Sequence, residues 1–258
     1  MQKQRKSMAK KKELRQHKIL DILDKKDLMR TTDLAKEVQV TPETIRKDLD
    51  EMESQGLVRR EHGYVRKIKA MVESPMARRK LKNKALKERI AYRAIEEIKD
   101  GQTVFLDSGS TLLSGTDLLR SKKDLTIVTN SIPMVLAVMD LGFKVILLGG
   151  VFQKQSQRTE GFFATEMLEA IHIDTAFLGT CGIRGASGFG VYSDAEIETR
   201  KKIIQKADRT VAVMDSSKFN EPAAFQFCTF DEIDTLITNL LTEGQRSIVS
   251  KIKNIIEV

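Results

Sequence analysis

Small hydroxyl residues and glycines follow several short apolar runs in the second part of the sequence. The run TVFLD leads into residues 108–111, SGST, and LTIVTN leads into Ser131. If these runs are parallel strands, their ends meet at one sheet edge, where backbone N–H groups and hydroxyls suit a phosphate. Lys218 could supply a counter-charge there. The candidate ligand-binding residues are Asp107, Ser108, Gly109, Ser110, Thr111, Thr129, Asn130, Ser131, Gly149, Gly150, Gly179, Gly182 and Lys218.

Other chemistry at this edge is poorly supported. The loop at residues 107–111 has no Gly-Lys-Ser/Thr, which argues against a nucleoside triphosphate. Ser110 taken alone could simply cap a helix. The three histidines, His17, His62 and His172, are scattered along the chain. We therefore predict no metal, no cofactor and no catalytic residue.

A second candidate site lies near the amino terminus, on a predicted helix that begins at Pro42. Thr44 and Arg46 fall on the side away from Ile45 and Leu49, so they are free to meet a partner. Arginine can pair bidentately with guanine, and threonine can contact a base edge or a phosphate. The candidate DNA-binding residues are Thr32, Thr41, Glu43, Thr44, Arg46, Lys47, Arg59, Arg60 and His62. A plain three-helix scaffold with a charged surface is the alternative.

Three helices and a hairpin would have to position those residues. Apolar spacing within ELRQHKILDILDKK predicts the first helix, with Leu14, Ile19, Ile22 and Leu23 as its apolar positions. A turn at residues 27–30 follows, and Thr31 or Thr32 can cap a short second helix whose inner face is Leu34, Ala35 and Val38.

The third helix has signals at both ends. Thr41 can cap it, Pro42 suits its first position, and Gly56 can end it in a left-handed conformation. The alternation in LVRREHGYVRKI then predicts a β-hairpin about His62, with Arg66 beside the other arginines. This order of elements is typical of a winged helix-turn-helix that binds DNA.

The remainder of the chain alternates apolar strands with helices. Strands are expected at TVFLD, LTIVTN, KVILLGG, TAFLGT, TVAVMD and TLITN, with a last helix from about Glu243. Buried runs of this kind, separated by helices, predict an α/β fold with a doubly wound, mostly parallel sheet. The expected domains are 11–69 for DNA binding, 70–84 as a linker, and 85–258 as a sensor.

Charge divides the chain in the same way. Residues 1–89 hold 26 Lys and Arg against 14 Asp and Glu, whereas residues 90–258 hold 18 against 22. A basic third favours a polyanionic partner, and a membrane surface is disfavoured because no basic amphipathic helix with large aromatics is present. No signal peptide and no membrane span are apparent, so we expect a soluble cytoplasmic protein.

Nearly the whole chain resembles the DeoR family of transcriptional regulators. TIRKDL and the HG turn carry the resemblance at the amino terminus, and DGQTVFLDSGST, TNS, LLGG, AFLGTCGI, GFGV and DSSKF carry it later. The resemblance implies a sensor domain similar to ribose-5-phosphate isomerase, which binds a phosphorylated sugar or related metabolite and thereby releases the repressor from its operator. Its phosphate loop falls on residues 107–111, its asparagine loop on 129–131, and its late lysine on Lys218.

Three positions depart from the family pattern. Tyr64 replaces the second glycine of the wing, Ser110-Thr111 replace two threonines, and Leu86-Lys87 replace a Glu-Lys pair. The predicted function is a sequence-specific regulator of double-stranded operator DNA, a repressor of a carbohydrate-utilisation operon, working as a homodimer or homotetramer. The alternative is a sugar-phosphate isomerase with a DNA-binding extension, in which Asp107, Glu196 or Lys218 would act as acid or base.

Overall fold

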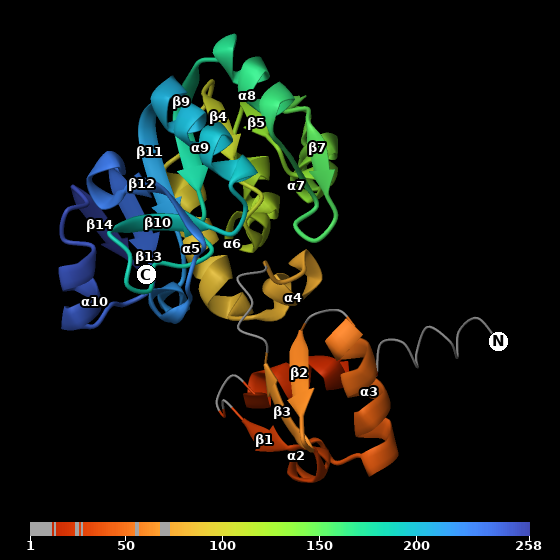
Figure 1. Ribbon diagram of the computed structural model, residues 1–258. Coiled ribbons are helices and arrows are strands. Elements are labelled where there is room, and N and C mark those ends of the chain that lie inside the picture. Colours follow the sequence, from red (N-terminus) through yellow and green to blue (C-terminus); the bar gives the residue numbers. More distant parts are fainter. Residues whose placement is uncertain (1–11, 13, 24–25, 27, 55–56, 68–72) are drawn as a thin grey trace. The chain divides into compact units, whose positions relative to one another are not determined.

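The chain folds into two compact units, Met1–Ala70 and Met71–Val258 (Figure 1). The computed structural model describes residues 12, 14–23, 26, 28–54, 57–67 and 73–258. Each unit has its own core, so each is described by itself below.

The first unit is a winged helix-turn-helix. Residues 14–23 are helical, and the further elements are β1 (Met29–Arg30), α2 (Thr31–Val38), α3 (Pro42–Ser54), β2 (Val58–Glu61) and β3 (Tyr64–Lys67). The strands form a small antiparallel sheet in the order β1-β3-β2. Ile45, Leu49 and Met52 are fully buried, which confirms the predicted inner face of the third helix.

The helix ends agree only in part with the expectations. Thr41 does cap α3, because its Oγ1 accepts a hydrogen bond from the N–H of Thr44 at 3.2 Å. The predicted cap of α2 was wrong: the helix begins at Thr31, and the hydroxyl of Thr31 donates to the carbonyl of Gly63 instead. Leu14 is 56% exposed rather than part of the core. Gly56 lies outside the described residues.

The second unit contains a seven-stranded sheet in the order β14-β13-β11-β9-β4-β5-β6. Every pair of neighbours in it is parallel. The strands are β4 (Thr103–Leu106), β5 (Thr126–Thr129), β6 (Lys144–Leu147), β9 (Ile173–Leu178), β11 (Ala207–Val213), β13 (Thr235–Thr238) and β14 (Asn254–Glu257).

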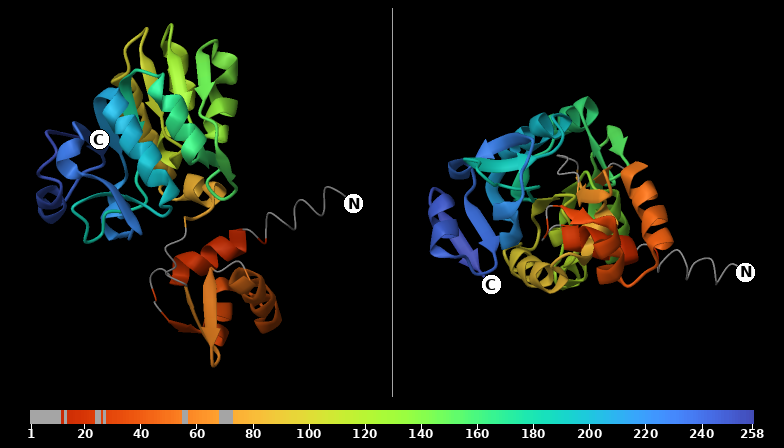
Figure 2. Two further views of the ribbon diagram at one scale, coloured as in Figure 1. Left: turned by 45° about the horizontal axis from the view of Figure 1, so that its top comes forward. Right: turned by 60° about the horizontal axis from the view of Figure 1, so that its bottom comes forward.

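Helices cover both faces of this sheet (Figures 1 and 2). They are α5 (Lys84–Glu96), α6 (Ser110–Leu113), α7 (Ile132–Val138), α8 (Phe162–Glu169), α9 (Ala195–Lys206) and α10 (Glu243–Ile248). Along β4, Phe105 packs into the core that holds residues of α8 and α9, whereas Val104 and Leu106 pack into the core that holds residues of α5 and α7. Alternate side chains therefore fill two apolar layers, as a doubly wound sheet requires.

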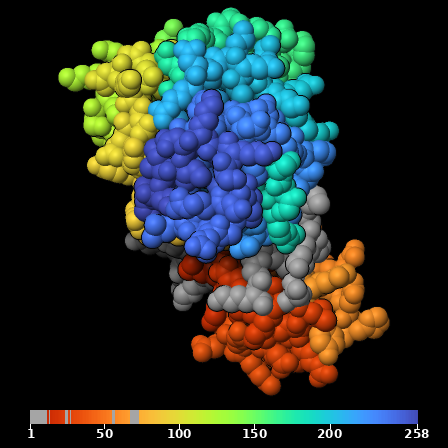
Figure 3. Space-filling view, turned by 90° about the vertical axis from the view of Figure 1, so that its left-hand side faces the viewer, coloured from red at the N-terminus to blue at the C-terminus, as the bar shows by residue number. Residues whose placement is uncertain are grey.

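Several elements were not expected from the sequence. Helix α4 (Met76–Leu81) lies inside the range expected as a linker, and Met76 is buried. Two antiparallel pairs stand apart from the main sheet: β7 (Val151–Gln153) with β8 (Arg158–Glu160), and β10 (Gly188–Val191) with β12 (Phe225–Thr229). The helix expected from about Glu243 is confirmed as α10, but the edge strand β14, which was not expected, follows it as the last element. The C-terminal residues, in dark blue, lie on the face of the unit seen in Figure 3.

None of the helices in the described part of the chain is long and apolar enough to cross a membrane.

Candidate functional site

The amino-terminal half of α3 presents its polar residues away from the core. Arg46 is exposed next to the fully buried Ile45, and no hydrogen bond or ion pair of its side chain is seen among the described residues. Lys47 is exposed and pairs with Glu43 at 2.9 Å, one helical turn away. Thr32 and Thr41 are also exposed. This side of α3 therefore offers the cation and hydroxyl that the sequence predicted.

The wing keeps a tight tip despite Tyr64. His62 and Gly63 have φ values of 50° and 81°, as the favoured two-residue hairpin turn requires. Tyr64 belongs to β3, where its hydroxyl accepts a hydrogen bond from Arg30 at 2.9 Å and its ring lies 5.4 Å from the same guanidinium. Tyr64, in place of the usual glycine, therefore connects β1 to the wing, and the hairpin turn keeps its expected conformation.

Arginines of the wing fall into two groups. Arg59 and Arg66 are directly opposite each other on β2 and β3, and both are exposed. Like charges directly opposite each other are unfavourable, and Glu61, which pairs with Arg66 at 3.1 Å, offsets part of this repulsion. Arg60 instead turns toward α3, where it pairs with Asp50 and, at 3.0 Å, with Glu53. Arg60 therefore holds the wing against α3.

The second candidate site lies where the strand order reverses. From β4 the chain proceeds outward through β5 and β6, then returns to β9 on the other side of β4. Ligands of open α/β sheets bind at such switch points, beyond the carboxyl ends of the strands. Asp107, after β4, and Gly179, after β9, meet here, with the N–H of Gly179 donating to Asp107 at 2.8 Å.

Asp107 is engaged within the protein. Arg200 of α9 donates to Asp107 at 3.0 Å and also to the carbonyl of Gly179 at 2.9 Å. A Cβ at Gly179 would lie 3.1 Å from the Asp107 carboxylate, which explains the glycine at this position. These contacts hold the ends of β4 and β9 together and fix the start of the 107–111 loop.

A buried lysine supplies positive charge beside that loop. Lys87 of α5 is 4% exposed, and its ammonium donates to the Ser110 hydroxyl at 3.0 Å and to the carbonyl of Arg79. Burial lowers the pKa of Lys87 to about 8, even though the nearby charge of Asp215 favours the ammonium. Helix α6, which follows the loop, is only four residues long. Its dipole is therefore small, and Lys87 supplies more of the positive charge beside the loop than the helix end does.

Sequence reasoning missed Lys87 as a site residue, although a signal was present. Lys87 lies on the same stripe of α5 as Ile90, Ala91 and Ala94, all of which are fully buried. A charged residue on the apolar stripe of an amphipathic helix is seldom buried without a partner. The pattern could therefore have identified it.

Lys218, which follows β11, adds a further positive charge near Lys87. Lys218 donates to the carbonyl of Cys181 at 3.2 Å, next to Gly182. Burial disfavours the charged form of Asp215, but hydrogen bonds from Ser217 and Asn83 and the charges of Lys218 and Lys87 hold its pKa below the usual value. Asp215 thus links the start of α5, the helix that carries Lys87, to the segment that carries Lys218.

The remaining predicted residues divide between the site and the scaffold. Thr129 donates to the carbonyl of Leu106 at 2.6 Å, which places the end of β5 beside β4, and the buried Asn130 Oδ1 has no hydrogen-bond partner. Ser131 caps α7. Gly149, Gly150 and Gly182 have backbone roles: Gly149 donates to the sulfur of Met167, and a Cβ at either of the other two would clash with a carbonyl oxygen.

A chain of buried ion pairs runs from the switch point to the first described residue of the unit. Arg200 pairs with Glu196, Glu196 with Arg158, and Arg158 with Glu73 at 2.6 Å. Glu73 also pairs with Arg79 at 2.7 Å, yet Nε and Nη2 of Arg79 are buried without a hydrogen-bond partner. No periodicity marks Glu73, Arg79 or Arg158 in the sequence, so their roles could not be predicted.

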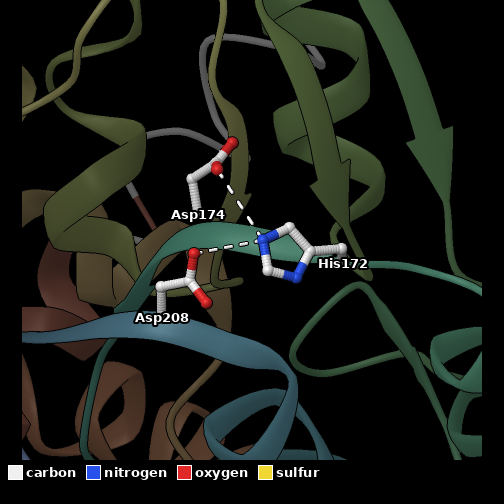
Figure 4. A group of neighbouring side chains, drawn as sticks. All are labelled: His172, Asp174 and Asp208. Atoms are coloured by element: carbon white, nitrogen blue, oxygen red, sulfur yellow. Dashed lines mark hydrogen bonds and ion pairs between the residues drawn. The ribbon is translucent and has the colours of Figure 1, made fainter.

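Among the described residues, one cluster of possible metal ligands lies at the amino ends of the strands, opposite to the switch point. His172 lies 3.1 Å from Asp208 and 3.8 Å from Asp174, at the amino ends of β9 and β11 (Figure 4). All three are at least partly exposed, and Asp174 also accepts the N–H of Thr103. These contacts join neighbouring strands, and they are remote in the fold from the switch point.

Comparison with known proteins identifies both units. Residues 15–70 match the DeoR-like helix-turn-helix domain, and residues 82–240 match the DeoR C terminal sensor domain. The glycerol-3-phosphate regulon repressor of Escherichia coli K12 is 28% identical over 226 residues, which is 87% of this chain and 90% of that protein. The putative aga operon transcriptional repressor of Escherichia coli O157:H7 is 29% identical over 229 residues, 87% and 85% of the two chains.

Among solved structures, ribose 5-phosphate isomerase A of Methanocaldococcus jannaschii aligns with a TM-score of 0.39 and 18% identity over 53% of this chain and 54% of that one. The enzyme of Neisseria gonorrhoeae gives 0.37 and 16% over 64% and 63%. The strand order of the sheet, and not these alignments, identifies the fold. Because the matched models cover both units, the chain belongs to the DeoR family of DNA-binding transcriptional regulators, which are not enzymes.

Proposed function

We propose that this regulator represses genes of carbohydrate use in the cytoplasm and is released from its operator by a phosphorylated sugar or related metabolite. Two relatives are named as repressors, of a glycerol-3-phosphate regulon and of an aga operon, which supports this direction of control. Paired operator half-sites require more than one copy, so the working form is a homodimer or homotetramer.

The buried ammonium of Lys87 is the observation that carries the proposal for the ligand. A buried cation to which no described carboxylate is hydrogen-bonded is costly even with the charge of Asp215 nearby, and an anion beside it would recover that cost. The Ser110 hydroxyl, the unpaired nitrogens of Arg79 and the nearby Lys218 could share a phosphate with it. We retain the loop at residues 107–111 with Thr129 and Asn130 as further ligand contacts.

On the DNA side, we propose that Arg46 reads a base edge while Thr44 and Lys47 contact bases or phosphates. Arg59 would bind backbone phosphate, which would resolve its opposition to Arg66. Thr32, Thr41, Glu43 and His62 border this surface, and Arg60 positions the wing.

Release requires that the ligand favour a DNA-incompetent arrangement. We propose that Arg79 couples the two events. When a phosphate takes up the guanidinium of Arg79, the ion pair with Glu73 weakens, and Glu73 begins the described part of this unit, just after residues 68–72. A hundredfold release needs about 2.7 kcal/mol of coupling, which is within the usual range.

Fluorescence anisotropy with operator DNA and a panel of sugar and polyol phosphates, glycerol 3-phosphate included, tests the ligand site. Lys87→Met should bind DNA like the wild type but should lose release by the active phosphate. Lys84→Met is the matched control, because Lys84 is an exposed lysine on the same helix. Release by the unphosphorylated parent compound alone, or normal release of Lys87→Met, would refute the assignment.

A further inference from the structure

Large apolar side chains gather on the β6 edge of the second unit. The described part of the chain exposes fifteen of them, and eight come from residues 136–167 alone. They belong to α7, the residues after it, β6, β7 and α8; of these, α7, β7 and α8 lie on one side in Figure 1. The eight are Leu136, Met139, Leu147, Val151, Phe152, Phe162, Phe163 and Met167.

Several of these side chains lie on segments that adjoin one another. Phe162 and Phe163 contact each other edge to face with ring centres 5.5 Å apart. Val151 pairs with Glu160, two residues before Phe162, so β7 adjoins the start of α8. Phe152 then faces α7, where it lines a groove of about 440 Å³ together with Leu136, Ile132 and Pro133.

The area of this surface is that of a protein interface. Phe162 and Phe163 are 68% and 67% exposed, and the other six lie between 36% and 65%. Taking about 150–250 Å² for a whole aromatic side chain and somewhat less for an aliphatic one, the eight present on the order of 800 Å². A standard interface buries roughly 800 Å² per partner, whereas the largest patch of a monomer is about 300–600 Å².

Charge and shape indicate which partner covers it. The exposed charged side chains within residues 136–167 are Asp140, Lys144, Lys154 and Glu166, two of each sign. Lys80, which also lines the groove, adds one positive charge. A surface so close to neutral does not suit DNA or an anionic membrane, but it allows two identical copies to meet without strong repulsion. It also carries both projecting phenylalanines and an apolar groove, as a self-complementary twofold contact requires.

We infer that this apolar edge is the self-association surface of the protein, where two copies meet about a twofold axis and bury Phe152, Phe162 and Phe163. This inference deepens the proposed function, in which paired half-sites need paired chains, and it names the surface that pairs them. Self-association can be measured without DNA or effector, so its failure and a failure of the proposed regulation are distinguishable.

The test is sedimentation velocity of the full chain at about 0.1–50 μM, where even an interface at the weak, micromolar end of this size class is populated. The wild type should sediment as a dimer or a multiple of it. Phe162→Glu places a charge in the contact and should weaken association at least a hundredfold. Leu240→Glu is the matched control, because Leu240 is 75% exposed and follows β13, away from β6 in the sheet order.

A wild-type monomer throughout that range would overturn the inference, as would dimers of Phe162→Glu that are as tight as those of the wild type. Equal weakening by Leu240→Glu would place the contact elsewhere and would also overturn it. Since both substituted side chains are exposed, the fold should be kept, and unchanged thermal unfolding of monomeric Phe162→Glu would show that lost association is not lost folding.

Discussion

At the scale of single residues, side chains of the same type play different roles within one unit. Arg46 is an exposed cation with no ion pair among the residues that the structure describes, whereas Arg60, fourteen residues later, pairs with Asp50 and Glu53. Lys84 is solvated, whereas Lys87 on the next turn is buried. Burial and available partners, and not residue type, decide which cations can take part in binding.

Arg46→Ala should weaken specific DNA binding by roughly 1–3 kcal/mol if Arg46 reads a base, and discrimination at one base pair should relax. Anisotropy on operator and scrambled DNA measures both effects. Arg120→Ala, at an exposed arginine of the sensor unit, is the control and should change nothing. An equal loss on both DNAs would make Arg46 a phosphate contact instead.

Ligand affinity should depend on the protonation of Lys87. Because its pKa is lowered to about 8, the ammonium is charged at pH 7 and mostly neutral at pH 9. A phosphate that binds only the ammonium form should therefore bind about tenfold more weakly at pH 9 than at pH 7. Calorimetric titration across that interval gives the profile, and Lys87→Met should flatten it. A flat profile for the wild type would show that Lys87 does not face the anion.

At the scale of elements, what the sequence predicts depends on how local the signal is. The cap at Thr41 and the buried face of α3 depend on neighbouring residues, so they could be predicted. The two-residue strand β1 exists only because β3 lies next to it, and β14 follows a helix at the far edge of the sheet, so neither carries a sequence signal of its own.

The same distinction holds for the ligand site. The loops after β4, β5, β9 and β11 were predicted from turn residues that follow apolar runs. Lys87 reaches the loop after β4 only through tertiary packing, and Arg79 and Glu73 are connected to it through further contacts from segments that precede β4 in the chain. Asp107 was predicted from its place after an apolar run, but its partner Arg200, 93 residues away, could not be predicted from the local sequence.

Glu73 should matter for coupling, and its removal should not weaken ligand binding. Glu73→Gln keeps the size of the side chain but removes the charge that Arg79 and Arg158 hold. Because Glu73 no longer competes for Arg79, we expect the variant to bind the phosphorylated ligand at least as tightly as the wild type, with release from DNA reduced from about a hundredfold to less than tenfold. Calorimetry and anisotropy separate the two quantities. Unchanged release would remove Glu73 from the coupling path.

At the scale of the whole molecule, most of the excess positive charge lies in the DNA-binding unit. Residues 1–70 hold 19 Lys and Arg against 12 Asp and Glu, whereas residues 71–258, which include Lys87, Arg79 and all seven strands of the parallel sheet, hold 25 against 24. A sensor without excess positive charge does not compete for DNA, so the ligand need only alter how the DNA-binding units are presented.

The central claim is that this chain is a sequence-specific regulator under the control of a phosphorylated ligand. Its most direct test is fluorescence anisotropy of the purified protein on DNA from upstream of its own gene and on scrambled DNA, at physiological salt, where non-specific binding is weak. We predict a preference of about a hundredfold or more that one phosphorylated sugar abolishes and its unphosphorylated parent does not. Equal affinity for operator-containing and scrambled DNA, unaffected by any phosphate, would contradict the account.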